Sequence, residues 1–198
     1  MMGTYAGLYC FGALVGGGET GWAQTALFGV AIIAGMTVSA ALGVAVERIA
    51  YKPLRKAPRL APLLSAIGVS IILMNVAALI FGGEPQRFEY PFDNTAIDVH
   101  GIAVTPHQLM VLGVSLTLMI ALKLFIDRSR LGKAMRATSE NQDVAALMGI
   151  NVNLIISLTF AIGSALAAVA GILTALEYKV YPTMGTMAGL KAFIAAVV

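Results

Sequence analysis

The chain has 198 residues, of which 59% are hydrophobic and 12% are charged, and its formal net charge at pH 7 is +3. The charged share is about half of that in soluble domains, so the composition excludes an ordinary water-soluble protein. The small positive charge does not indicate nucleic-acid binding, and the single cysteine, Cys10, excludes a disulfide within the chain.

Long stretches without any charged residue recur along the chain. A helix that crosses a bilayer needs about 20 mostly apolar residues, and four of the five uncharged stretches reach that length. We therefore predict an all-α fold class, a polytopic transmembrane helix bundle with about five spans plus the start of a sixth, in a single membrane domain over residues 1–198. The predicted spans are 2–16, 23–46, 60–82, 104–124 and 152–176, and the sixth starts near Met187.

Charged residues concentrate in the connections between these spans, and their sign alternates. Segments 47–59 and 123–143 are mainly basic, whereas segment 83–107 is mainly acidic. Because membrane-flanking loops rich in Lys and Arg remain in the cytoplasm, we expect the two basic segments inside and the acidic segment outside.

Two rows of small residues at a spacing of four lie within predicted spans. Small residues along one helix face allow a neighbouring backbone to approach closely. Ordinary helix packing explains both rows, and the alternative is that one row lines a translocation path. The rows are Gly35, Ser39 and Gly43 in the second span and Gly163, Ala167 and Gly171 in the fifth.

Asn75 is the amide well inside a predicted span, where it needs a hydrogen-bond partner. It either bonds across helices or faces a polar path. The second to fifth spans carry no Asp, Glu, Lys or Arg at mid-depth. Since ion-driven carriers commonly place ionisable groups there, the energy for transport is expected to come from elsewhere. No catalytic, cofactor-binding or metal-ligating residues are predicted, because no nucleotide-binding motif or ligand cluster is present.

The segment 127–151 is expected to form a cytoplasmic loop between two spans. Within it, Ser139 followed by Gln142 fits a capping box, and Gly149 fits the left-handed position that closes a helix. The pattern predicts a short amphipathic helix over about 140–148. A helix this short is marginal alone in water. It should dock either on the membrane surface or its own bundle, or else in a groove of a partner protein.

This loop carries a resemblance to a known family. Asp143-Val144-Ala145, three residues and then Gly149 resemble the EAA-x3-G loop of ABC importer permeases, with Asp for Glu and Val for the first Ala. Three separated segments together resemble the permeases of branched-chain amino acid (Leu/Ile/Val) ABC importers, and look closest to the first of the two homologous permeases. They are ERIAYKPLRKAPRLAPLLSAIGVSI (47–71), GKAMRATSENQDVAALMGINV (132–152) and MGTMAGLKAFIAAVV (184–198).

The resemblance covers essentially the whole chain and implies a role for it. Family members are usually much longer, so this chain is expected to be truncated at both ends. The resemblance implies a multi-pass permease subunit of the bacterial cytoplasmic (inner) membrane, which belongs to an ATP-driven importer of branched-chain or related amino acids. It implies no enzyme activity and no cofactor in this chain, because ATP is used by partner subunits.

The implied partners are a second homologous permease, two cytoplasmic ATPase subunits, an extracytoplasmic amino-acid-binding protein and the lipid bilayer, but no nucleic acid. The short helix would then be a coupling helix that sits in a groove of the ATPase. The expected coupling residues are Ser139, Glu140, Asp143, Ala145 and Gly149, and the candidate pathway or packing residues are Asn75, Gly163, Ala167 and Gly171.

Two other classes of function remain as alternatives. A secondary carrier or channel would need an ionic pathway, which the spans do not show. A membrane scaffold that transports nothing would explain the rows of small residues, but it would not explain the resemblance in three separated segments.

Overall fold

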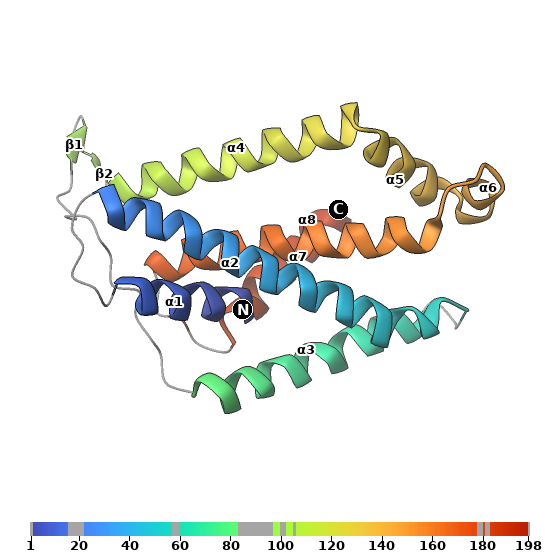
Figure 1. Cartoon of the computed structure of the whole chain (residues 1–198), viewed down its shortest axis with the longest axis horizontal. Helices are drawn as coiled ribbons and strands as arrows, with labels where there is room; N and C mark the ends of the chain where they lie inside the picture. The colour runs from blue at the N-terminus through green and yellow to red at the C-terminus, as the bar shows by residue number, and fades with distance from the viewer. Residues whose placement is uncertain are drawn as a thin grey trace. The chain divides into compact units, whose positions relative to one another are not determined.

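The structure, a computed structural model, is a set of helices with one small hairpin (Figure 1). The residues that it describes are 2–15, 22–56, 60–82, 97–99, 102–104, 106–177, 180 and 183–197. The all-α prediction is confirmed, and the chain is a multi-pass membrane protein. Most of the acidic connection, residues 83–96, lies outside the described residues.

Four helices among the described residues are long and apolar enough to cross a membrane, and they confirm the predicted second to fifth spans. Helices of 14 residues stand at the predicted first span and at the start of the sixth. The long helices are α2 (Trp22–Val46), α3 (Leu60–Phe81), α4 (Pro106–Arg128) and α7 (Val152–Glu177), and the shorter ones are α1 (Met2–Val15) and α8 (Met184–Val197).

The connections contain more regular structure than the sequence indicated. Directly after α2 the chain forms a π-helical turn, Glu47–Tyr51, which the amide of Lys52 closes by donating to the carbonyl of Glu47. A 3₁₀ turn, Pro53–Lys56, follows. The remaining elements are the antiparallel hairpin of β1 (Ile97–Val99) and β2 (Ile102–Val104), with helices α5 (Arg130–Glu140) and α6 (Gln142–Leu147).

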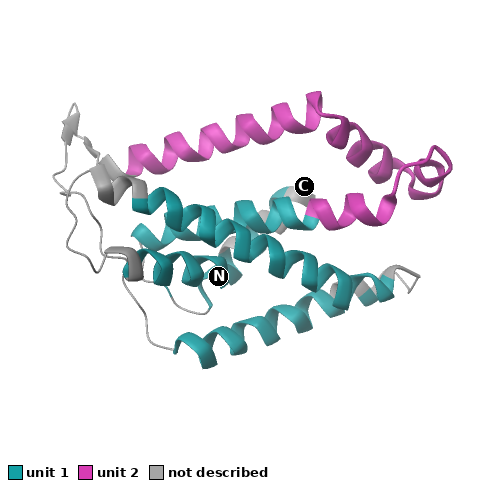
Figure 2. Cartoon of the chain, in the orientation of Figure 1, with its two compact units in different colours: residues 1–89, 160–198 teal, residues 90–159 magenta. Residues whose placement is uncertain are grey.

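The chain divides into two compact units (Figure 2). Unit 1 comprises residues 1–89 and 160–198, and unit 2 comprises residues 90–159. Helix α7 begins in unit 2 and continues into unit 1. Unit 1 holds the close helix packing, and unit 2 holds the loop that the sequence singled out.

In unit 1, helices α1, α2 and α7 meet through small residues. A Cβ built on Gly3 of α1 would lie 2.7 Å from the Cβ of Ala168 and 2.8 Å from the carbonyl oxygen of Gly35, so no larger residue fits there. The hydroxyl of Ser39 donates to the carbonyl of Ser164 over 2.7 Å. The α2 row of small residues is therefore a packing row, as the first interpretation of it held.

Aromatic contacts complete the packing of α1. The ring of Tyr5 stacks on Phe81 of α3, with centroids 4.6 Å apart and planes 3° from parallel. Phe11 meets Phe28 of α2 edge to face, with centroids 6.0 Å apart. Such pairs contribute about 0.5–1.5 kcal/mol each beyond the area that they bury. Helix α1 is thus held by glycine contacts near its start and by rings further along.

Substituting Gly35 with Ala should destabilise unit 1, because the new Cβ would lie 2.7 Å from the carbonyl oxygen of Gly3. We expect the free energy of unfolding of the full chain in mixed micelles to fall by about 1–3 kcal/mol. Gly29→Ala on the same helix is the control, since a Cβ there meets nothing within 4 Å. Equal stability of the two variants would contradict the packing argument.

Candidate functional site

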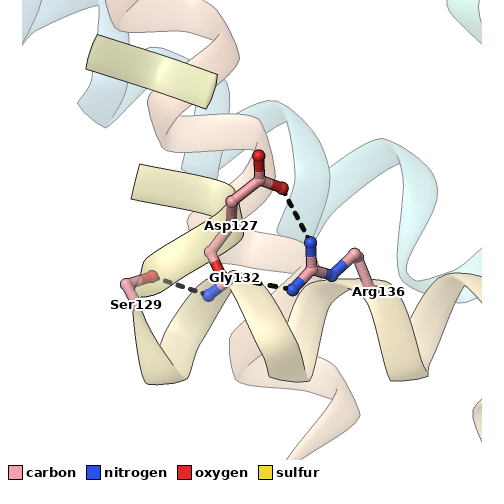
Figure 3. A network of polar contacts seen from close by, with 4 residues as sticks. All are labelled: Asp127, Ser129, Gly132 and Arg136. Atoms are coloured by element: carbon pink, nitrogen blue, oxygen red, sulfur yellow. Dashed lines mark hydrogen bonds and ion pairs between the residues drawn. The ribbon is translucent and has the colours of Figure 1, made fainter. Parts of the chain in front are cut away.

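The corner between α4 and α5 is the first part of the candidate site (Figure 3). The backbone leaves the helical conformation at Ser129, with φ −80° and ψ 153°. The Ser129 hydroxyl oxygen then accepts a hydrogen bond of 2.8 Å from the amide of Gly132. This is an N-cap, which satisfies one of the free amides at the start of α5.

Gly132 allows the two helices to touch at this corner. It is buried, and a Cβ built on it would overlap the backbone of Ile126, 2.6 Å from its carbonyl carbon. Every residue other than glycine would push α5 away from the end of α4. The corner is therefore a contact between two backbones.

A third contact joins α5 to α4 across the same corner. One guanidinium nitrogen of Arg136, Nη1, donates to the Asp127 carboxylate over 2.8 Å, and Nη2 donates to the Asp127 carbonyl over 3.4 Å (Figure 3). Both side chains are about half exposed, so the ion pair contributes roughly 0–1 kcal/mol to stability. The pair adds one more contact between the end of α4 and α5.

Helix α6 starts two residues later than predicted, and the predicted capping box is wrong. The N-cap is Asn141, whose side-chain oxygen accepts from the amides of Asp143 (3.0 Å) and Val144 (3.1 Å). Ser139 lies in the last turn of α5 instead, and its hydroxyl donates to the carbonyl of Arg136. The reason is that the extended backbone break falls at Asn141, with φ −153°, and this leaves Ser139 in the preceding helix.

The end of α6 agrees with the prediction for Gly149. Its φ is +83°, the left-handed conformation that favours glycine. The amide of Ile150 donates to the carbonyl of Ala145, and the amide of Gly149 donates to that of Ala146. These two bonds are the Schellman pattern, which closes a helix and satisfies its last carbonyls. Asn151 then caps α7 by accepting from the amide of Leu154 over 3.2 Å.

The outer surface of α6 is apolar. Ala145 is buried, but Leu147 and Met148 are 87% and 78% exposed, and Val144 is 53% exposed. The acidic residues Glu140 and Asp143 are also exposed. Of the five predicted coupling residues, three lie within α6 or its end, whereas Ser139 and Glu140 belong to the last turn of α5.

The predicted pathway or packing residues do not form one group. Gly163 and Ala167 are exposed, whereas Gly171 packs against the hydroxyl of Thr4. The exposed amide of Asn75 donates to the carbonyl of Ile71 in its own helix. The α7 face that contacts α1 and α2 includes Ser164, Ala168 and Ile172, and of the predicted row Gly171 lies on this face. Among the described residues, no group of three His, Cys, Asp or Glu side chains could hold a metal ion.

Comparisons with known proteins point to one family. The family described as "Branched-chain amino acid transport system / permease component" matches residues 1–198. The chain is 42% identical to the high-affinity branched-chain amino acid transport system permease protein BraD of Pseudomonas aeruginosa, over 84% of this chain and 56% of that protein. It is 39% identical to LivH of Escherichia coli K12, a permease protein with the same description, over 100% of this chain and 65% of that protein.

A more distant relative is the probable branched-chain amino acid transport permease protein LivH of Methanocaldococcus jannaschii, which is 28% identical over 87% of this chain. The chain spans between about half and two thirds of the length of these relatives. No solved structure matches the chain.

Replacing Asn141 with Ala should loosen α6, because two amides lose their cap. The expected loss of about 1 kcal/mol corresponds to about fivefold faster hydrogen exchange at the amides of Ala145 and Met148. Ser139→Ala is the matched control, since that hydroxyl bonds only within α5. If exchange becomes faster in the Ser139 variant and is unchanged in the Asn141 variant, Ser139 is the cap of α6 and the assignment to Asn141 is wrong.

Proposed function

The chain belongs to the family of permease components of branched-chain amino acid transport systems, and from this premise we propose that it forms the membrane path of an ATP-driven importer. The substrate class is branched-chain or related amino acids, and the membrane is the cytoplasmic one. The proposed partners are a second permease, two ATPase subunits on the cytoplasmic side and an extracytoplasmic binding protein. In this proposal the chain itself hydrolyses no ATP.

The observation that carries the proposal is the surface of α6. A helix of six residues is too short to be stable alone, yet this one is capped at both ends and presents exposed Leu147 and Met148. An apolar helix surface with that exposure suits insertion into a groove of another protein. We assign the groove to the ATPase, so that α6 is the coupling helix.

The contacts around α6 provide a route for movement. The α5 side is attached to α4 through Ser129, Gly132 and the pair of Arg136 with Asp127. The other side reaches α7 after the four residues 148–151, and Asn151 caps that helix. When the ATPase subunits close on ATP and displace α6, α4 and α7 would therefore be moved with it. Rigid, hydrogen-bonded elements of this kind can carry coupling between distant sites.

Replacing Gly149 with Leu should uncouple transport, because the left-handed backbone at φ +83° strains a residue with a branched side chain. We expect uptake of labelled leucine by the assembled transporter to fall strongly while the amount of protein in the membrane is unchanged. Gly149→Asn is the control, since Asn tolerates this conformation better than other residues do. Normal uptake by the Leu variant would remove Gly149 from the coupling assignment.

Replacing Leu147 with Asp should weaken docking, because it places a charge on a side chain that is 87% exposed in the chain alone and buried in the proposed complex. We expect ATPase binding to weaken about tenfold or more, measured by co-purification and by ATP-dependent uptake of leucine, isoleucine and valine. Leu147→Met keeps an apolar contact and should preserve both. If the chain with all of its proposed partners takes up none of these amino acids, the proposed function is wrong.

A further inference from the structure

Basic side chains gather at the corner between α4 and α5 without acidic partners. Arg128, Arg130 and Lys133 are all exposed, and the described part of the chain holds no ion pair with any of them. The neighbouring Arg136 differs, because Asp127 already neutralises it. The corner therefore carries three unneutralised positive charges within six residues.

The position of these charges relative to the membrane follows from α4. Its apolar segment runs from Gln108 to Arg128, and none of it is buried within the molecule. The span thus ends at the first of the three basic residues. Arg130 and Lys133 follow in the first turn of α5, which the Ser129 break and Gly132 hold against the end of α4 (Figure 3). All three cations consequently lie where the hydrocarbon gives way to lipid headgroups.

Exposed apolar side chains stand beside the cations. Leu124 is 50% exposed, Phe125 36% and Leu131 39%. Lipid acyl chains can cover Leu124 and Phe125 on α4. Leu131 lies between Arg130 and Lys133 in the sequence. The combination of an apolar helix end with a cluster of Lys and Arg is the arrangement that attracts anionic lipids at a membrane surface.

Charge segregation along α5 and α6 favours a lipid over a partner protein as the occupant of this cluster. The unpaired cations stand at the start of α5, whereas the acidic residues Glu140 and Asp143 stand at its end and in α6. The 11 residues of α5 separate the two ends by about 16 Å. The α6 surface assigned to the ATPase is therefore distinct from the cationic corner.

We propose that Arg128, Arg130 and Lys133 bind the phosphate of an anionic phospholipid headgroup in the leaflet that the positive-inside rule assigns to the cytoplasm. Guanidinium and ammonium groups form charge-assisted hydrogen bonds with phosphate oxygens. A bound headgroup holds the α4–α5 corner at the membrane surface. The site is a property of the chain itself and does not depend on which substrate is transported.

The test measures lipid binding to the full chain purified in a neutral detergent. The chain is titrated with phosphatidylglycerol or phosphatidylcholine, and native mass spectrometry counts the bound lipids. We expect a preference for phosphatidylglycerol that falls about fivefold for each charge removed. The variant Arg128→Gln/Arg130→Gln/Lys133→Gln should lose most of this preference, and Arg128→Lys/Arg130→Lys should keep it because the charges remain.

The control Asp127→Asn/Arg136→Gln alters the same corner but removes a neutralised pair, so it should bind lipids as the unaltered chain does. The proposal is overturned if the unaltered chain shows no preference between the two lipids. It is also overturned if the triple Gln variant retains the preference. If that variant retains it but no longer co-purifies with the ATPase, the cations belong to a protein interface instead.

Discussion

The contact of one backbone with another, made possible where a side chain is missing, is the constraint on which this structure depends. Lipid is as apolar as a leucine side chain, so membrane helices gain little from hydrophobic burial and associate through close packing and hydrogen bonds. Gly3 meets Gly35 and Ala168 in unit 1, and the Ser39 hydroxyl bonds the backbone of α7. None of the residues in these contacts between α1, α2 and α7 is charged.

Unit 2 also contains a backbone-to-backbone contact at a glycine, at the end of the α4 span. Gly132 places the start of α5 against the backbone of Ile126. Here polar groups supplement the contact, since the Ser129 cap and the Arg136–Asp127 pair bond across the same corner. Near water these bonds are individually weak. Together with the Gly132 contact they attach the start of α5 to the end of α4.

The proposed importer function depends on α6, which follows the α4–α5 corner of unit 2. Helix α6 exposes its apolar residues because its caps are satisfied locally by Asn141 and by the turn at Gly149. The residues that hold α6 in place are therefore different from those that would dock, so docking can change without disturbing the fold. The cationic corner adds an attachment to the membrane at the opposite end of α5.

The sequence by itself determined the membrane class, the four long helices and the left-handed Gly149. A bilayer excludes charged residues over about 20 consecutive positions, which the sequence shows directly. A glycine directly after a short predicted helix favours closure in the left-handed conformation, and this too can be recognised from the sequence. Only the structure decided that Asn141 and not Ser139 caps α6, because several residues near the break have side chains that can cap a helix. It also decided which face of α7 packs. Residues 163 and 164 differ by about 100° around a helix, and the choice of Ser164 over Gly163 depends on where α2 lies.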